Sequence, residues 1–434
     1  MIYLRHFKNF PEAEVNFDRP VTLLIGPNGA GKSNLIEAVE LLCFIASGRP
    51  LHEITDLGRE GGLEVRGGLD GCAAFGHEEF TLGFKDRVLT AAEVTYEISI
   101  RVGKEPRIIR ESLKVKGRKP AIFEVVPGKA GSASGDNQIR HDNFARGKNK
   151  PVSVAAADRS ALSQYSRFAR KHQWTKETQD LVDGVMAALT PPSVFDPVPK
   201  LMRSYERETE TRLARNGFNL SPVLANLCRN PSPSNVAPKR NPQSPASERI
   251  LSLIRQLPDE PFKKFDFIRT DAGDVMFGFR ANGDDRPATA RILSDGTLRA
   301  LAVLTALETG RFGQQIIVEE FDNGVHPSRV QLLTSALFDC SERNGLKSLV
   351  TTHNPATLNA LTPEQLQSVL LVTHTPGAHG GRLIRLPDLP GYIEFIEQGR
   401  LGDLITRRVY EQHLSGPYED DRRKELEKWL ENLP

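Results

Sequence analysis

Residues 26–33 read Gly-Pro-Asn-Gly-Ala-Gly-Lys-Ser and are the part of the chain best suited to chemistry on a phosphate. The apolar run 21–25 precedes them directly, and residues 34–38 continue with a pattern typical of a helix. Glycines let successive backbone N–H groups turn toward one anion, and a helix that starts there adds its partial positive charge. The spacing therefore predicts a strand, a phosphate-binding loop and a helix, and we expect this loop to bind a nucleoside triphosphate.

Two side chains at the end of this loop have defined roles in such a site. We expect Lys32 to reach the β- and γ-phosphates and the Ser33 hydroxyl to ligate Mg²⁺. A glycine-rich turn without a ligand is the alternative, and the flanking strand and helix patterns argue against it. The candidate nucleotide-binding residues here are Gly26, Pro27, Asn28, Gly29, Ala30, Gly31, Lys32, Ser33 and Asn34.

A second candidate is the apolar strand 315–320, which ends in Glu319 and Glu320. Two adjacent acids at the end of a buried strand are costly unless a cation or hydrogen bonds compensate them. We expect Glu319 to hold Mg²⁺, directly or through water, and Glu320 to polarise the attacking water. The alternative is an acidic strand end that faces solvent.

A third candidate is the sequence Leu-Ser-Asp-Gly-Thr at 293–297, which precedes a helical pattern. Alone, such a sequence often only marks a turn and a helix N-cap. Together with a phosphate loop and an acidic strand, it predicts a second anion-binding helix N-terminus. We expect Ser294 and the backbone of Gly296 to be offered to a γ-phosphate.

A histidine follows the third strand of this region, in the sequence Thr351-Thr352-His353. A lone histidine is usually structural. At the end of a core strand it can instead contact a γ-phosphate by hydrogen bonding. The residues expected to act in catalysis are therefore Glu320, His353 and Lys32.

The pattern of the whole chain predicts an α/β fold with a mixed sheet core, an antiparallel β lobe and a helical insertion. We expect an N-terminal half at 1–157, a helical insertion at 158–260 with a flexible loop at 229–246, and a C-terminal half at 261–434. The last segment, 420–433, has helical spacing and is expected to dock on the chain's own core. Strands are expected in 1–25, 80–126, 261–282, 315–320, 347–352 and 367–373, and helices in 158–190 and 218–228.

Composition excludes several classes of protein. The chain has 434 residues and a net charge of +2, so global charge does not indicate a nucleic-acid partner. Its four cysteines form no Cys-x2-Cys pair, which fits a reducing compartment without a zinc site. No apolar stretch approaches the ~18 residues of a membrane span, and the N-terminus lacks the pattern of a signal peptide. We expect a cytoplasmic protein.

A basic run occupies 104–119, where seven lysines and arginines stand against two glutamates. Such a run is either a solvated face of a strand or a patch that binds nucleic-acid phosphates. Both interpretations are open at this point. The seven residues are Lys104, Arg107, Arg110, Lys114, Lys116, Arg118 and Lys119.

The candidate motifs, in this order, resemble those of an ABC-type ATPase head of the RecF-like, structural-maintenance-like branch. The run 319–327, Glu-Glu-Phe-Asp-Asn-Gly-Val-His-Pro, is similar to that of bacterial AAA family ATPases related to overcoming-lysogenisation-defect proteins and to anti-phage defence ATPases. The segments 4–10 and 399–404 are also typical of that branch. The resemblance covers about residues 1–40 and 290–405.

The resemblance implies ATP and Mg²⁺ as cofactors and places Lys8 and Asn9 near the nucleotide. It implies a homodimer in which ATP joins the phosphate loop of one subunit to Ser294 of the other, and which hydrolysis releases. It also implies a glutamine that contacts the metal, for which Gln164 is the candidate. Two departures stand out, since the family usually has Asp at position 319 and Pro at position 321.

Two functions follow from these expectations. The first is an ATP-hydrolysing switch in DNA maintenance or anti-phage defence. The alternative is an ATP-gated scaffold that holds and releases a separately encoded effector, a nuclease or a toxin, with little turnover. We expect no nuclease site in the chain itself, because no Asp-x-Asp pair follows His353. A transporter subunit does not fit the helical insertion or the His326-Pro327 pair, and DNA is left open as a partner.

Overall fold

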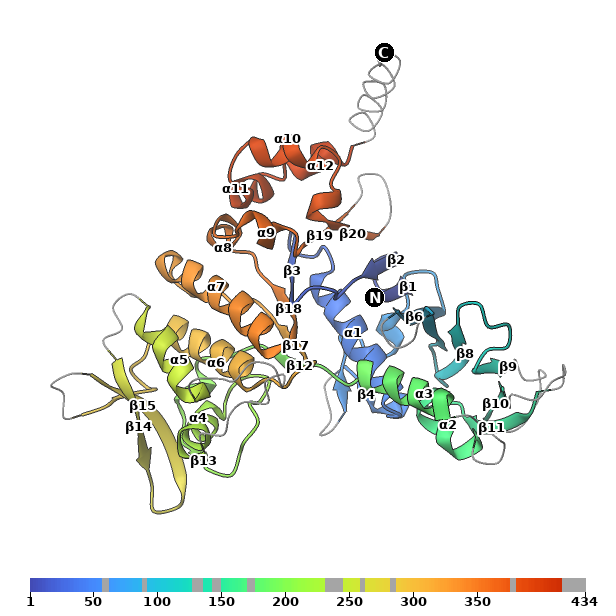
Figure 1. The fold of residues 1–434 in the computed structure, drawn as a ribbon, viewed down its shortest axis with the longest axis horizontal. Helices are drawn as coiled ribbons and strands as arrows, with labels where there is room; N and C mark the ends of the chain where they lie inside the picture. The colour runs from blue at the N-terminus through green and yellow to red at the C-terminus, as the bar shows by residue number, and fades with distance from the viewer. Residues whose placement is uncertain are drawn as a thin grey trace, which may run out of the picture. The chain divides into compact units, whose positions relative to one another are not determined.

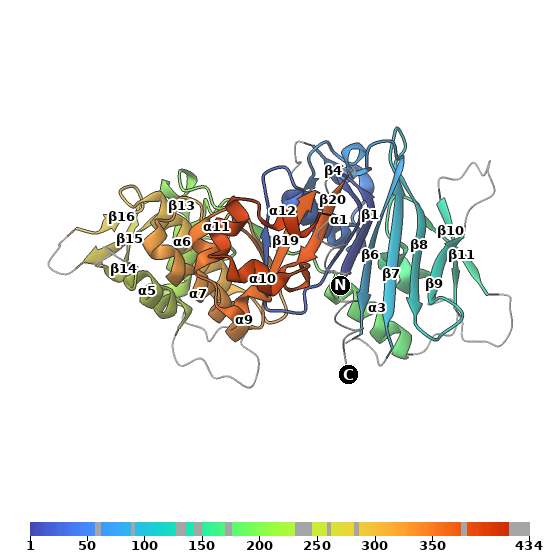
Figure 2. The same ribbon diagram turned by 90° about the horizontal axis from the view of Figure 1, so that it is seen from above.

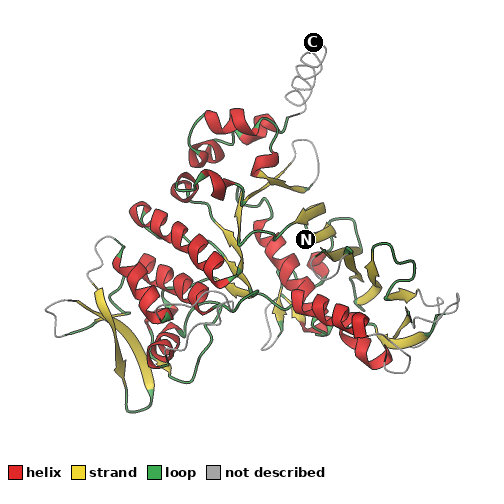
Figure 3. Cartoon of the chain, in the orientation of Figure 1, coloured by secondary structure: helices red, strands yellow, loops and turns green. Residues whose placement is uncertain are grey.

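The computed structural model describes residues 1–56, 62–87, 92–126, 136–142, 150–169, 176–230, 245–257, 262–281, 286–374 and 380–415. Figure 3 shows its helices and strands. The predicted loop at 229–246 lies mostly outside these residues, and the predicted helix at 420–433 lies entirely outside them.

The chain folds into two compact units whose segments alternate along the sequence. The first contains Met1–Asp18, Asn28–Pro192 and Thr373–Leu383. The second contains Arg19–Pro27, Ser193–Val372 and the residues from Ile384 onward. The chain therefore passes from the second unit to the first within the phosphate loop. The domain boundaries expected at residues 157 and 260 stay a prediction.

An antiparallel sheet of eight strands forms most of the first unit, in the order β11-β10-β9-β8-β7-β6-β1-β2 (Figure 2). Alternate residues such as Tyr96 and Ile98 are buried, as expected of a sheet with one covered face. The predicted antiparallel lobe is therefore confirmed. Its strands are β1 (Ile2–Phe7), β2 (Phe10–Val15), β6 (Glu79–Asp86), β7 (Val94–Arg101), β8 (Arg107–Val115), β9 (Phe123–Val126), β10 (Asp136–His141) and β11 (Val152–Ala156).

Helices α1 (Lys32–Ala46), α2 (Ala161–Ala169) and α3 (Lys176–Ala188) complete the first unit, with the short pair β4 (Ile54–Thr55) and β5 (Leu63–Glu64). The buried carboxylate of Glu111, on β8, fixes the start of α2. It accepts the N–H groups of Ala161 and Leu162 at 2.7 and 2.9 Å, and the hydroxyls of Ser160 and Tyr96 at 2.8 and 2.9 Å. Burial raises the pKa of this carboxyl, and the four hydrogen bonds oppose that shift.

The basic run begins at Lys104, just before β8, and continues along β8 and the residues that follow it. The side chains of Arg107, Arg110 and Lys114 are exposed, while the carboxylate of Glu111 in the same strand is buried. Carboxylates on other strands of the sheet lie near the exposed basic side chains. The carboxylate of Glu79, for example, is 3.8 Å from the guanidinium of Arg101 and 3.9 Å from that of Arg110. This arrangement favours the interpretation as a solvated strand face.

A six-stranded sheet in the order β12-β17-β18-β3-β19-β20 belongs mainly to the second unit, while the end of β19 and the first residues of β20 are counted with the first. Neighbouring strands from β12 to β19 all pair in parallel, which is the pattern expected of an α/β core. These strands are β3 (Val21–Ile25), β12 (Ser193–Phe195), β17 (Gln315–Val318), β18 (Lys347–Thr351), β19 (Val369–His374) and β20 (Gly381–Arg385). A second, smaller sheet contains β13 (Glu206–Arg207), β14 (Phe262–Arg269), β15 (Asp274–Ala281) and β16 (Ala288–Thr289).

Helices α5 (Ala246–Arg255), α6 (Asp295–Thr309) and α7 (Pro327–Asn344) lie side by side in this unit (Figure 1). Helix α6 is apolar on nearly all sides and is correspondingly buried. Near its end the buried carboxylate of Glu308 pairs with Arg249 of α5 at 2.8 Å and with Arg343 of α7. The remaining helices are α4 (Leu220–Arg229), α8 (Pro355–Asn359), α9 (Pro363–Leu366), α10 (Tyr392–Glu397), α11 (Leu401–Thr406) and α12 (Tyr410–His413).

One hydrophobic core joins these strands and helices of the second unit. It includes Val21 and Leu23 of β3, and it continues through Leu301 of α6 and Leu337 of α7. Burial of such side chains is the main source of stability of an α/β unit. Among the helices of the part of the chain described here, none has the length and apolar character that crossing a bilayer requires.

The contacts of Glu111 predict the effect of replacing it. Glu111→Gln keeps the size of the side chain but turns an acceptor oxygen into a donor that faces other donors, which should cost about 1–3 kcal/mol. We expect thermal unfolding, followed by calorimetry, to shift down by several degrees. Glu124→Gln is the matched control, because Glu124 forms a partly exposed pair with Arg140 at 3.0 Å. Equal shifts in the two variants would contradict the anchoring role of Glu111.

Candidate nucleotide-binding site

The phosphate loop has the backbone that its sequence predicts. Strand β3 is buried throughout and ends at Ile25, and α1 begins at Lys32. Between them Gly26, Gly29 and Gly31 have φ values of 144°, 78° and 115°, in the left-handed region that favours glycine. The loop therefore needs glycine at these positions for its conformation.

Two of these glycines are also needed because their surroundings leave no space. A Cβ atom on Gly26 would lie 2.0 Å from the carbonyl oxygen of Val372. One on Gly31 would lie 2.5 Å from Nδ2 of Asn9 and 2.8 Å from the ring of Phe10. Gly31 is the N-cap of α1 and offers no side-chain cap, so the first turn of α1 is suited to an anion as its cap.

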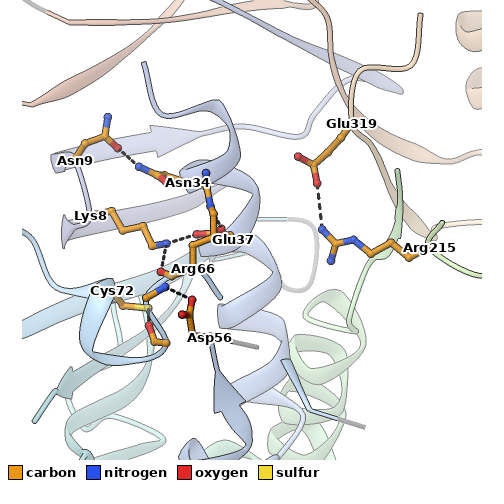
Figure 4. A network of polar contacts seen from close by, with 11 residues as sticks. Lys8, Asn9, Asn34, Glu37, Asp56, Arg66, Cys72, Arg215 and Glu319 are labelled. Carbon is orange, nitrogen blue, oxygen red and sulfur yellow. Dashed lines mark hydrogen bonds and ion pairs between the residues drawn. The ribbon is translucent and has the colours of Figure 1, made fainter. Parts of the chain in front are cut away.

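Asn9 supports this loop from the turn between β1 and β2 (Figure 4). Its Nδ2 donates to the carbonyl of Ala30 at 2.8 Å, and its Oδ1 accepts from Nδ2 of Asn34 at 2.7 Å. One side chain thus holds both the loop and the first turn of α1. These contacts are with the loop and with α1, and the expected place of Asn9 near the nucleotide stays a prediction.

Lys8 is bound one turn further along α1. Its Nζ pairs with the carboxylate of Glu37 and donates to the carbonyl of Arg66 at 3.0 Å. The guanidinium of Arg66 contacts Glu37 at 2.6 Å and Asn34 at 3.0 Å (Figure 4). Arg66 was not among the residues expected from the sequence, and the following Gly67-Gly68 pair was the only local signal for an unusual loop there.

The parallel strands of the second unit bring the other candidates to one edge. Leu24 of β3 pairs with Thr351 of β18, and Val318 of β17 pairs with Val350. The segments that begin at Gly26, Glu319 and Thr352 therefore leave the sheet at the same edge, where α/β proteins bind ligands. The sequence placed Glu319 and Glu320 in the strand, whereas β17 ends at Val318 and both follow it.

Glu320 has a strained backbone and a defined environment. Its φ is 46°, which is uncommon for a residue other than glycine. Its N–H donates to the hydroxyl of Thr351 at 2.8 Å, and its carboxylate accepts from Nδ2 of Asn323 at 2.7 Å. The other carboxylate oxygen lies 3.8 Å from Nε2 of His353, so the structure brings these two candidates together.

Glu319 is paired with an arginine. Its carboxylate lies 3.1 Å from Nη2 of Arg215 (Figure 4). Its N–H donates to the carbonyl of Phe195 at 2.9 Å. Arg215 comes from a loop distant in sequence, and no local motif indicated it. The pair partly neutralises the acid that was expected to hold Mg²⁺.

The segment 293–297 forms the start of α6, as expected. Ser294 is the N-cap, and its hydroxyl accepts the N–H of Thr297 at 3.1 Å. Gly296 is buried, and a Cβ atom there would lie 2.7 Å from the carbonyl oxygen of Gly324. Close packing against the segment after β17 is therefore sufficient to explain why residue 296 is glycine. That Ser294 and the backbone of Gly296 bind a phosphate stays a prediction.

The structure does not bring Gln164 to the phosphate loop. Gln164 lies in α2, and its amide bonds with the backbone of Ala156, Arg159 and Ser160. The adjacent Ser163 contacts Gly48, just beyond the C-terminal end of α1. A Cβ atom on Gly48 would lie 2.8 Å from the side chain of Ser163. A helix rises about 1.5 Å per residue, so this end is roughly 20 Å from Ser33. That position argues against Gln164 as a ligand of a metal held by Ser33.

No cluster of three or more histidine, cysteine or acidic side chains suited to a metal occurs among the described residues. Ser33 lies in the first turn of α1 and Glu319 directly follows β17, and their expected role as magnesium ligands stays a prediction. The glycine loop and the start of α1 fit a triphosphate.

The contacts of Asn9 predict its effect on nucleotide binding. Asn9→Ala removes two hydrogen bonds that hold the loop and α1, so the affinity for Mg·ATP should fall by about tenfold. Isothermal titration calorimetry measures this directly. Asn16→Ala is the control, because Asn16 is exposed and its side-chain amide donates to the carboxylate of Asp18. Unchanged affinity in Asn9→Ala would show that the loop holds its shape without Asn9.

Comparison with known proteins gives short matches to curated relatives. The chain is 52% identical over 48 residues to the DNA replication and repair protein RecF of a Synechococcus species, which is 11% of this chain and 13% of that protein. It is 48% identical over 60 residues to RecF of Thermosynechococcus vestitus, which is 14% of this chain and 16% of that protein. The chain thus matches only about an eighth to a sixth of the length of these relatives.

Among solved structures, the chain has low-scoring matches to heads of Smc proteins. One, the Smc head bound to the C-winged helix domain of ScpA, has a TM-score of 0.48 and 11% identity over 88% of this chain and 95% of that chain. Another, from Thermotoga maritima, has a TM-score of 0.37 and 14% identity over 88% of this chain and 97% of that chain.

The sequence pattern of a whole protein family matches over most of the chain. The matched region is residues 21–359, more than half of the sequence, and it runs from β3 through the phosphate loop to α8. It therefore includes the segments that carry Lys32, Ser294, Glu320 and His353. Together with the RecF matches, this confirms the predicted resemblance to ABC-type AAA ATPases of the RecF-like branch. The chain belongs to the family described as "AAA domain, putative AbiEii toxin, Type IV TA system".

Proposed function

We propose that this ABC-type head binds and hydrolyses ATP, dimerises around it, and works as a switch in DNA maintenance or anti-phage defence. The observation that carries the proposal is Glu320, a glutamate with a strained backbone 3.8 Å from His353. Both follow parallel strands at the edge where β3 leads into the phosphate loop. Strained residues of this kind cluster at functional sites.

The roles of the residues follow from the chemistry of phosphoryl transfer, which needs positioning and charge more than covalent catalysis. Lys32 and Mg²⁺ would neutralise the β- and γ-phosphates, with Ser33 and Glu319 as the protein groups near the metal. Glu320 would accept a proton from the attacking water, and His353 would hydrogen-bond the γ-phosphate. Ser294 of a second copy would contact the same phosphate, so that hydrolysis releases the dimer.

One observation favours the alternative, an ATP-gated scaffold with little turnover. Arg215 lies 3.1 Å from the Glu319 carboxylate and competes with Mg²⁺ for its charge. Such a protein would hold a separately encoded nuclease or toxin while ATP is bound. Substantial basal hydrolysis would favour the switch, and tight ATP binding without turnover would favour the scaffold. RecF is a DNA replication and repair protein, and DNA is the partner that this similarity suggests for the switch.

Lys32 tests the phosphate loop. Lys32→Ala removes the charge that neutralises the β- and γ-phosphates, and the affinity for Mg·ATP should fall by at least about a hundredfold. Calorimetric titration with a non-hydrolysable ATP analogue gives the dissociation constant. The control is Lys85→Ala. Lys85 belongs to the same unit as Lys32 and forms an ion pair with Glu14 at 3.5 Å on the large antiparallel sheet. Equal affinities in both variants would refute the loop assignment.

Glu320 tests the reaction and the dimer together. Glu320→Gln keeps the shape of the side chain but cannot accept the proton of water. ATP should still bind, turnover should fall by about 10²-fold or more, and an ATP-bound dimer should accumulate in size-exclusion chromatography with Mg·ATP. Adding Ser294→Arg to this variant should prevent the dimer.

Two further variants serve as controls for this experiment. Glu364→Gln changes an exposed glutamate of α9 and should leave turnover and oligomeric state as in the wild type. Glu319→Gln should instead weaken the binding of ATP that depends on Mg²⁺. A Glu320→Gln protein that binds Mg·ATP but stays monomeric at micromolar concentration would overturn the dimer around ATP.

A further inference from the structure

Successive residues of the segment after β17 are hydrogen-bonded to Thr351, the last residue of β18, and to Thr352, which follows it. Glu320 donates its N–H to the hydroxyl of Thr351 at 2.8 Å, and Phe321 donates its N–H to the carbonyl of Thr351 at 3.3 Å. Asp322 then accepts a hydrogen bond from the hydroxyl of Thr352 at 2.6 Å. Thr352 directly precedes His353, so one set of bonds connects the glutamate to the histidine.

Asp322 is the centre of these contacts. Its side chain is buried, with 2% of the residue exposed, and the same carboxylate oxygen also accepts the hydroxyl of Thr357 in α8. Burial raises the pKa of this carboxyl, and the two threonine hydroxyls oppose that shift. The Thr352 hydroxyl also accepts the N–H of Asn354 at 3.0 Å, so the backbone is held on both sides of His353.

We propose that Asp322 is a positioning residue, which acts through Thr352 and Thr357 to fix the separation of the Glu320 carboxylate and the His353 ring. The inference rests on the proposed function, since it assigns Asp322 a part in arranging groups that act on ATP. The strained backbone of Glu320 is unfavourable and persists only where the surroundings hold it. The bonds to Thr351 and Thr352 are such a restraint.

ATP turnover would then depend on the hydrogen bond between Thr352 and Asp322, although this bond does not contact the nucleotide. Displacing a reacting group by about 1 Å can reduce the rate by about 10²-fold. A purely structural role for Asp322 would reduce stability when the bond is removed, but it would not reduce turnover in the fraction of protein that is folded. The two roles therefore differ in a measurable way.

Thr352→Val separates these roles, because it keeps the shape of the side chain and removes the hydroxyl. We expect kcat for ATP to fall by about tenfold with KM changed by less than about twofold, since the loss concerns geometry and not binding. Thr352→Ser restores the hydroxyl and should recover most of kcat. Thr305→Val is the matched control, because Thr305 is also fully buried and donates one hydrogen bond, at 2.7 Å to Leu301 in its own helix.

Hydrogen exchange, followed by mass spectrometry without nucleotide, tests the same bonds independently of activity. The peptide that covers 319–325 should exchange faster in Thr352→Val than in the wild type, Thr352→Ser or Thr305→Val. Unchanged exchange there, or a kcat in Thr352→Val no lower than in Thr305→Val, would overturn the positioning role. Wild-type turnover in Glu320→Gln would instead refute the proposed function, and the exchange result would still decide whether Asp322 holds the segment.

Discussion

The parallel pairing of β3 with β18 is the contact on which the candidate site depends. It joins a strand near the N-terminus to a strand more than three hundred residues later, with Leu24 opposite Thr351. Parallel strands end at the same edge of a sheet, so this pairing sets the start of the phosphate loop beside the segment that carries His353. Because β17 pairs with the other side of β18, the two glutamates reach the same edge.

Buried carboxylates hold much of the rest together, and each is compensated by specific donors. Glu111 fixes the start of α2 on the antiparallel sheet, Glu308 joins α5, α6 and α7, and Asp322 joins the segments after β17 and β18. A buried carboxylate without partners would cost several kcal/mol, so these contacts form together with the packing around them. Asp322 contacts Thr352, which directly precedes His353.

The arginine pairs show why local motifs were insufficient. Arg215 approaches Glu319 from a loop before α4, and Arg66 approaches Asn34 and Glu37 from a loop after α1. Neither arginine stands in a recognisable sequence motif, because only the folding of the chain brings them to their partners. Gln164 shows the opposite. Its place in the sequence was compatible with a role in the site, but in the structure it lies near the far end of α1, away from Ser33.

The sequence by itself determined the phosphate loop, the antiparallel lobe, the strand pair at 262–281 and the parallel strands of the C-terminal part. These features depend on local rules, such as glycine for positive φ and alternating burial in strands, which short segments express fully. Only the tertiary structure decided that the strand of residues 315–320 ends at Val318, that Glu320 is strained beside His353, and that Arg215 pairs with Glu319. Such relations join residues far apart in the chain, and no local pattern encodes the distance between them.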